Sequence, residues 1–238
     1  MPLGELIGRG ASSEVYAWTA DTVVKLFVPQ FEDLADVELE RTRAVHAAGA
    51  PCPAVHDIVE VDGRPGLILD RLTGPSLFFE RGAASTLAHI HAELHDVAPL
   101  GLPQLADTLS SWGIEGMATG SSLFHGDLHP ANVLRHDGRW HVIDWSNGHV
   151  APPAADVACS VLSIGYRGMR GADASVDVHR RRVRAADRYL ETYRSLRPEA
   201  LADLPTWLTT IGRLLLDREP DTAFADELAV RWIDPSLH

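Results

Sequence analysis

The chain has 238 residues, of which 45% are hydrophobic and 23% are charged, the composition of a globular protein with one large domain or two small ones. Its net charge of −12 excludes ordinary nucleic-acid binding, which needs clustered cations. The apolar runs are too short to span a bilayer, the first residues do not resemble a signal peptide, and two cysteines make no disulfide framework. We therefore expect a cytoplasmic monomer or homodimer with no membrane partner and no nucleic-acid partner.

Five short strands and one helix are predicted in the first 72 residues. The strands are rich in Val, Ile, Tyr and Trp, and Gly or Asp residues separate them. They are expected at residues 3–7, 14–20, 22–28, 54–61 and 66–71. Apolar residues recur at helical spacing from Phe31 to Val45, and Gly49 ends this helix. The dipeptide Asp62-Gly63 predicts a hairpin between the last two strands.

Beyond a candidate linker at Thr73-Gly74-Pro75, the sequence pattern becomes mainly helical. Helices are predicted at residues 83–95, within 102–117 and after Ala154, with breaks near Pro198 and Pro220. A small hairpin with His136-Asp137-Gly138 as its turn interrupts the helices. The fold class is therefore α+β with two lobes, a strand-rich N-lobe (1–72) and a mostly helical C-lobe (73–238).

The stretch HGDLHPANVL, residues 125–134, concentrates polar groups in one short loop. On a strand, His125, Asp127 and His129 would point to one face, as metal ligands could. However, Pro130 ends such a strand at once, and no further cluster with ligand spacing is obvious. A metal-hydrolase interpretation therefore has little support.

Phosphoryl transfer requires particular residues at fixed spacing, and the same loop has them. A kinase catalytic loop has the form H-x-D-L-x-x-x-N, which His125, Asp127 and Asn132 fit position by position. The aspartate accepts the proton of the acceptor hydroxyl, and the asparagine turns back to hold Mg²⁺ at the phosphates. A second metal-binding aspartate should follow a hairpin, and the stretch VIDW supplies Asp144.

The N-terminal strands supply the expected nucleotide-binding elements. The stretch IGRGASSEVY bridges the first two strands, and its glycines let backbone N–H groups approach phosphate. The candidate phosphate-binding residues of this loop are Gly8, Gly10, Ser12 and Ser13. The third strand carries Lys25, and the following helix offers Glu38 or Glu40 as its acidic partner, of which Glu38 is favoured. Each element alone is weak evidence for a kinase. However, all of them occur in the expected order along the chain, which is improbable by chance.

HGDLHPANVL followed by VIDW resembles the aminoglycoside phosphotransferase family, the small-molecule branch of the protein-kinase-like superfamily. HAAGAPCPAV at residues 46–55 also resembles that family, and the resemblance covers residues 4–160. It implies a bilobal kinase-like fold, an N-lobe antiparallel sheet with one helix, and ATP (or GTP) bound between the lobes. It further implies that Asp127 is the catalytic base, in a loop with His125 and His129, and that Asn132 and Asp144 hold Mg²⁺.

The resemblance also assigns supporting roles. Lys25 would contact the α- and β-phosphates, oriented by Glu38. The backbone of Asp70 to Leu72 would form the hinge that meets the nucleotide base. Asp156, in AADVA, would brace the catalytic loop from the following helix.

The acceptor is predicted to be a small molecule with a hydroxyl group, probably cationic, and an aminoglycoside is the leading candidate. No A-P-E motif follows Asp144, and Asp156 comes too soon for a peptide platform. The acidic composition would attract cations. Acidic positions in the C-terminal region, which could line the pocket or simply face solvent, are Asp217, Glu219, Asp221, Asp226 and Glu227. A kinase-fold regulator without useful turnover and an atypical protein kinase remain alternatives.

Two other patterns are interpreted as structural. His91 and His95 lie four residues apart on a predicted helix with Glu93 between them, but a zincin needs H-E-x-x-H. A helix that packs under the catalytic loop is the favoured interpretation. The basic cluster HRRRVR, residues 179–184, is expected to be a solvated helix face.

Overall fold

The computed structural model describes residues 3–167, 175–218 and 225–233. Its N-terminal part is an antiparallel five-stranded sheet in the order β1-β2-β3-β5-β4. The strands are β1 (Leu6–Arg9), β2 (Ser13–Ala17), β3 (Thr22–Phe27), β4 (Val55–Val61) and β5 (Arg64–Asp70). Helix α1 (Leu34–Ala47) packs on this sheet, with Phe27, Ala35 and Leu67 buried between them.

Two tight hairpins form where the sequence predicted them. Asp62 and Gly63, which join β4 to β5, have φ angles of 52° and 76°. Asp137 and Gly138, which join β7 (Val133–His136) to β8 (Arg139–Val142), have φ angles of 47° and 78°. Positive φ at both central residues is the geometry that matches the right-handed twist of paired strands, which explains the Asp-Gly preference.

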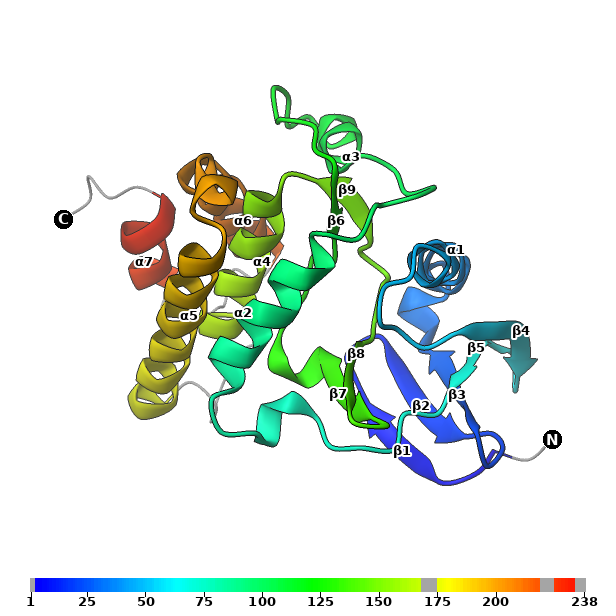
Figure 1. Cartoon of the computed structure of the whole chain (residues 1–238). Helices are drawn as coiled ribbons and strands as arrows, with labels where there is room; N and C mark the ends of the chain where they lie inside the picture. Colours follow the sequence, from blue (N-terminus) through cyan, green and yellow to red (C-terminus); the bar gives the residue numbers. More distant parts are fainter. Residues whose placement is uncertain (1–2, 168–174, 219–224, 234–238) are drawn as a thin grey trace.

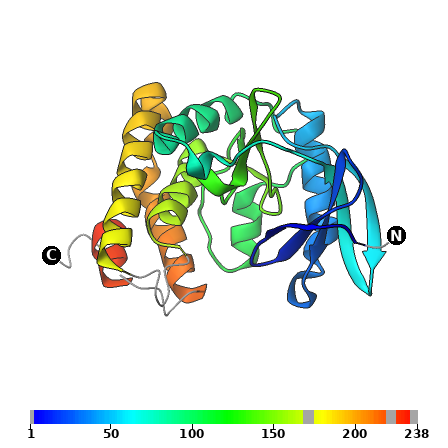
Figure 2. The same cartoon turned by 90° about the horizontal axis from the view of Figure 1, so that it is seen from below.

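The C-terminal part is mainly helical and lies on the opposite side of the molecule from the sheet (Figure 1). Its helices are α2 (Ala83–Leu94), α3 (Leu105–Ser111), α4 (Pro153–Gly165), α5 (Val176–Leu196), α6 (Leu204–Arg218) and α7 (Ala225–Leu228). Helix α4 is buried along almost its whole length, because it packs against both α5 and α6. Figure 2 shows the hairpin β7-β8 between these helices and the sheet.

A second short sheet was not predicted from the sequence. Strand β6 (Ser122–Phe124) pairs antiparallel with β9 (His149–Ala151). Strands are recognised by alternating apolar and polar residues, and three residues are too few to show this alternation. No sequence pattern therefore identifies these strands. The pair matters for the site because β6 runs directly into the loop at His125, and β9 runs into α4.

The segment between β5 and α2 is attached to the hairpin β7-β8. The backbone N–H of Arg135 donates to the carbonyl of Pro75 at 2.9 Å, and Thr73 N lies 3.3 Å from His136 Nδ1. A Cβ on Gly74 would lie 1.8 Å from the carbonyl oxygen of Arg135, so only glycine allows this close approach. The candidate linker is therefore held against the C-terminal part.

The remaining predictions agree with the structure apart from element boundaries. The first helix begins at Leu34, because Pro29–Phe31 forms a separate 3₁₀ turn. The break near Pro198 is confirmed, and Pro220 lies outside the described residues. Within the described ranges, no helix is both long and apolar enough to cross a membrane.

Candidate active site

Asp127 lies in a loop that begins where β6 ends. Its neighbour Gly126 has a φ of 79°, and a Cβ there would come within 2.6 Å of the Phe124 ring, so glycine is required. Asp127 Oδ1 accepts a hydrogen bond from Ser163 Oγ at 2.9 Å and lies 2.7 Å from Arg167 Nη1. Ser163 lies in the last turn of α4 and Arg167 follows that helix, and neither was predicted from the sequence.

The buried carboxylate of Asp156 fixes the backbone of this loop. Its two oxygens accept hydrogen bonds from the N–H groups of His125, at 2.6 Å, and Gly126, at 2.9 Å. The brace that the family resemblance implied is therefore confirmed. Burial alone would raise the pKa of Asp156, but the adjacent His91 and His95 rings hold it well below its ordinary value. The carboxylate is thus ionised over the whole neutral range.

His91 and His95 extend the brace to α5. Their Nε2 atoms lie 2.9 and 3.7 Å from Asp156 Oδ2, and their Nδ1 atoms lie 2.5 and 2.6 Å from the hydroxyls of Tyr189 and Tyr193. The three side chains could hold a metal ion, since their ligand atoms lie within 4.8 Å of one another. Because the carboxylate already accepts two backbone amides, we interpret the cluster as a structural network. Helix α2, which carries His91 and ends at His95, therefore packs under the catalytic loop as the sequence predicted.

The two histidines of the catalytic loop have different surroundings. His125 is 1% exposed, its Nε2 donates to the carbonyl of Ile143 at 2.9 Å, and its Nδ1 accepts from the N–H of Asp127. It therefore sits beneath the loop and positions Asp127. His129 is half-buried, and its Nε2 lies 3.9 Å from Asp127 Oδ2. Burial lowers the pKa of His129, which favours the neutral ring.

Asn132 and Asp144 offer the oxygen atoms that Mg²⁺ prefers. The amide nitrogen of Asn132 donates to the carbonyl of Asp127 at 3.0 Å, so its side-chain oxygen is available. Asp144 Oδ1 lies 3.1 Å from Lys25 Nζ and accepts from Ser146 Oγ, which leaves Oδ2 for a metal. Burial opposes ionisation of Asp144, but Lys25, His125 and Ser146 together outweigh it and lower the pKa. The donor set therefore fits a magnesium ion.

Lys25 forms a buried ion pair with Glu38, the partner that the sequence favoured. Its Nζ lies 2.7 Å from both carboxylate oxygens of Glu38. Burial would lower the pKa of Lys25, yet Glu38 and Asp144 together raise it, so the ammonium group stays charged. Glu40, the other candidate, is exposed and makes no described contact with Lys25.

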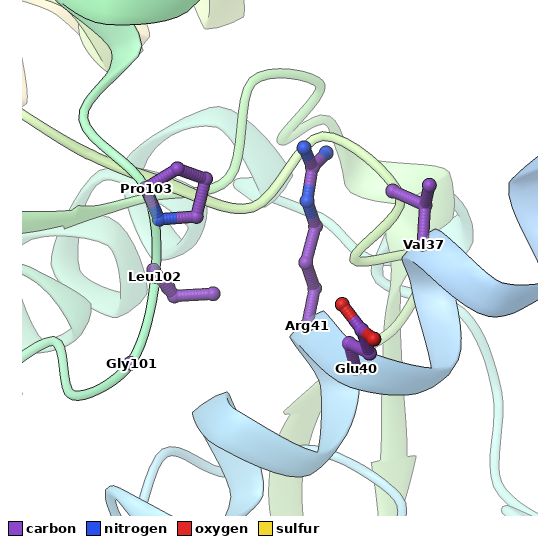
Figure 3. Close-up of a pocket in the computed structure, with 6 residues that line it drawn as sticks. All are labelled: Val37, Glu40, Arg41, Gly101, Leu102 and Pro103. Carbon is purple, nitrogen blue, oxygen red and sulfur yellow. The ribbon is translucent and has the colours of Figure 1, made fainter.

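Glu40 instead lines a cavity of about 150 Å³ between α1 and residues 101–103, as Figure 3 shows. Arg41 projects from α1 beside this cavity and donates to the carbonyl of Ser146. The helix that carries Glu38 is thereby tied to the segment that follows Asp144.

The loop between β1 and β2 is open enough to approach phosphate. A Cβ on Gly8 or Gly10 would meet no atom closer than 3.7 Å, so neither glycine is crowded by its neighbours. Ser12 is half-buried and Ser13 is buried at the start of β2. Of the predicted loop, the glycines and Ser12 are therefore the residues exposed enough to meet a ligand directly.

Most of the predicted hinge is already hydrogen-bonded. The N–H of Asp70 donates to Ala54 O, and the N–H of Arg71 donates to Asp21 O. The Asp70 carboxylate accepts from Ala54 N and from His56. Among the described bonds none involves the backbone of Leu72, so this residue is the part of the hinge left to meet a base.

A cavity of about 180 Å³ borders the catalytic loop between α3, α4 and α6. It includes Gly126, Ser163 and Arg167, and so reaches the carboxylate of Asp127. Two of the predicted acidic positions, Glu219 and Asp221, lie outside the described residues, and the others do not line this cavity.

The basic cluster on α5 has a structural function that the sequence did not reveal. Arg182 donates to the carbonyls of Ser163, Ile164 and Arg167, at 2.7 to 2.9 Å. These carbonyls lie at the C-terminal end of α4 and just beyond it, and the last carbonyls of a helix have no partner within the helix itself. The prediction of a solvated face is therefore wrong for Arg182, and also for His179, which is buried and pairs with Glu227. Its neighbours Arg180 and Arg181 are exposed, as predicted.

An antiparallel sheet with one helix, followed by a helical part that carries this loop, defines a kinase-like phosphotransferase fold. The phosphotransferase enzyme family matches residues 4–113 and 102–199, and the chain therefore belongs to that family. No curated protein matches the sequence.

Solved structures support the fold at low sequence identity. The apo form of a thermostable mutant of aminoglycoside phosphotransferase APH(4)-Ia superposes with a TM-score of 0.62 and 18% identity, over 98% of this chain and 95% of that one. A choline/ethanolamine kinase family protein from Mesorhizobium loti gives 0.60 and 14%, over 97% and 86%. An aminoglycoside-3'-phosphotransferase of type VIII gives 0.58 and 17%, over 84% and 87%.

Proposed function

We propose that this protein transfers the γ-phosphate of ATP (or GTP) to a hydroxyl group of a small molecule. One observation carries the proposal: Asp127, Asn132, Asp144 and the Lys25–Glu38 pair converge from separate elements around one loop that Asp156 fixes. A purely structural loop would not need three carboxylates and a buried lysine so close together, because each buried charge costs free energy unless it is paired.

Each residue then has a defined task. Asp127 orients the acceptor hydroxyl and accepts its proton, Lys25 contacts the phosphates, and the open glycine loop covers them. Asn132 and Asp144 would hold Mg²⁺, which neutralises charge on the phosphate oxygens when it is bound. Leu72 would meet the nucleotide base. We also propose that the lobes divide between Leu72 and Thr73, because Thr73 is bonded to the hairpin β7-β8.

Aminoglycosides are the first acceptor class to test. A structural neighbour, a mutant of APH(4)-Ia, is known in a ternary complex with AMP-PNP and hygromycin B, which supports nucleotide use and a small acceptor. The short segment between Asp144 and α4 supports a small acceptor over a peptide. A cytoplasmic location and a monomeric or homodimeric state stay predictions from the sequence.

The test is a turnover screen with Mg²⁺ and ATP or GTP over aminoglycosides, amino sugars, choline-like amines, nucleosides and hydroxy acids. We expect acceptor-dependent nucleotide consumption that disappears in Asp127→Asn. Nucleotide binding without turnover for every acceptor would favour a regulatory protein, and phosphate transfer to a protein would favour an atypical protein kinase. Absence of nucleotide binding would refute the proposal.

A further inference from the structure

We propose that Arg41 is a positioning residue, which holds Asp144 in the orientation that binds Mg²⁺. The inference rests on the proposed phosphotransferase function and adds a residue that lies outside its motifs. Arg41 lies on α1, about one turn after Glu38, and reaches the segment that follows Asp144. It contacts the backbone of that segment rather than the carboxylate itself, so its influence on the metal site is indirect.

Asp144 has a backbone conformation that needs support from its surroundings. Its φ angle is 67°, in the left-handed region, which residues other than glycine adopt rarely, although aspartate tolerates it better than most. Such a conformation persists where the surrounding contacts fix it. The carboxylate extends from this backbone, so a change in the turn that follows Asp144 would move the proposed metal ligand.

Two contacts within the segment shape this turn. The indole Nε1 of the buried Trp145 donates to the carbonyl of Val142 at 3.0 Å, and the N–H of Gly148 donates to the carbonyl of Trp145 at 2.8 Å. The carbonyl of Ser146, between them, accepts from Arg41 Nη1 instead. The turn is therefore held from within by its own residues and from outside by α1.

The Arg41 guanidinium has a second contact, on the side of the C-terminal part. His149 Nδ1 donates to the carbonyl of Asn147 at 2.8 Å, so the Nε2 of the neutral ring accepts hydrogen bonds. This Nε2 lies 3.0 Å from Thr108 Oγ1 and 3.5 Å from Arg41 Nη2. Burial lowers the pKa of His149, which favours the neutral ring. The histidine therefore helps to direct the guanidinium at the turn.

The contacts of Arg41 close a ring through the proposed metal and phosphate sites. Lys25 Nζ lies 2.7 Å from the Glu38 carboxylate and 3.1 Å from Asp144 Oδ1. Ser146 Oγ donates to the same Asp144 oxygen at 3.1 Å. Arg41 joins Ser146 to the helix that carries Glu38, which completes the ring. Loss of Arg41 would open it beside Asp144 and leave the Lys25–Glu38 pair intact. The metal site should therefore suffer more than the phosphate-binding lysine.

Arg41→Gln should separate metal-dependent binding from nucleotide binding as such. Affinity for a non-hydrolysable ATP analogue is measured on the full chain, with Mg²⁺ and with EDTA. Because residues that orient a metal ligand typically contribute about 10- to 100-fold, we expect roughly tenfold weaker affinity with Mg²⁺ and a change below about twofold with EDTA. Arg41→Lys keeps a donor for the Ser146 carbonyl and should recover most of the loss. Arg43→Gln is the matched control, since Arg43 is exposed on the same helix.

Amide hydrogen exchange gives a second readout, in the metal-free protein. In Arg41→Gln, the N–H groups of residues 145–148 should exchange faster than in the wild type, because the turn has lost its contact with α1. The N–H groups of β3 and β5 should keep their wild-type rates. A variant that had merely lost stability would instead exchange faster in those strands as well.

The inference would be overturned by equal weakening with Mg²⁺ and EDTA, by no weakening, or by a loss that Arg41→Lys does not recover. Unchanged exchange at residues 145–148 would also overturn it. A wild type that binds Mg²⁺–nucleotide and phosphorylates an acceptor would in each case still support the proposed function. A wild type that binds no nucleotide would refute the proposed function itself.

Discussion

Three aspartates in or near the catalytic loop have the same side chain but different surroundings. Asp156 is buried and accepts two backbone amides, so it fixes the loop. Asp144 faces Lys25 with one oxygen and keeps the other available. Asp127 faces a serine and an arginine at the edge of a cavity. Their environments, rather than their chemistry, separate the brace from the proposed metal ligand and the proposed base.

We expect Asp127→Asn to fold and bind nucleotide but to lose about 10²- to 10⁴-fold in turnover, because a positioned base contributes that much. The comparison is made by acceptor-dependent ATP consumption with any active acceptor. Asp137→Asn is the matched control, since Asp137 is 91% exposed and asparagine tolerates its positive φ. Near wild-type turnover of Asp127→Asn would show that another group accepts the proton.

Asp144→Ala should weaken nucleotide affinity in Mg²⁺ and leave affinity in EDTA nearly unchanged. The reason is that, in the proposed function, Asp144 supplies a metal ligand and touches the nucleotide only through the metal. Titration calorimetry with the ATP analogue, with and without Mg²⁺, measures both values. Equal weakening in both conditions would mean that Asp144 acts through Lys25 instead of through a metal.

At the scale of elements, the sequence predicted those features whose signals lie in neighbouring residues. Long helices, the two Asp-Gly hairpins and the catalytic motif were visible because their signals occupy adjacent positions. The pair β6-β9 was not visible, because two three-residue strands carry no period and their partners are separated by more than twenty residues. Arg182 was misinterpreted for a related reason, since its three carbonyl partners lie at the end of another helix and just beyond it.

The catalytic motif itself could be predicted, whereas the cavity beside Asp127 could not. Residues 125–134 form one continuous stretch whose spacing has meaning by itself. The cavity wall draws on α3, α4 and α6, which approach one another only in the folded chain. Ser163 and Arg167 face Asp127 across more than thirty positions of sequence, and nothing near them in the sequence indicates this contact.

The pair β6-β9 can be tested through Gly120, which precedes β6. A Cβ at this position would lie 2.0 Å from the backbone carbon of Ala151. Gly120→Ala should therefore force the strands apart, destabilise the protein by about 1–3 kcal/mol, and reduce turnover through the displaced loop. Gly165→Ala is the control, because its Cβ would meet Ala186 at an ordinary 3.7 Å. Equal melting temperatures for both variants would contradict the close approach.

At the scale of the whole molecule, the brace under the catalytic loop links stability to pH. Burial lowers the pKa of His95 from 6.5 to about 4, so its neutral form is favoured in the folded state. The unfolded chain then binds more protons between these values. This contribution is fully present above pH 6.5 and is lost as pH falls toward 4, at about 1.4 kcal/mol per pH unit.

Denaturant unfolding at several pH values tests this link. We expect the free energy of unfolding of the wild type to fall faster between pH 6.5 and 4 than that of His95→Gln, which cannot titrate. His89→Gln is the control, since His89 is exposed on the same helix. Parallel curves for wild type and His95→Gln would show that His95 does not titrate in this range.

The attachment of the linker to the hairpin β7-β8 has a mechanical consequence. Arg71 is bonded to Asp21, which directly precedes β3, and Thr73 is bonded to His136 in the C-terminal part, so Leu72 alone separates the two attachments. Any relative rotation of the two parts along this connection would concentrate in the backbone angles of one residue. A nucleotide base in contact with Leu72 would then restrict the backbone angles of that residue. Nucleotide binding would therefore reduce the relative rotation of the two parts.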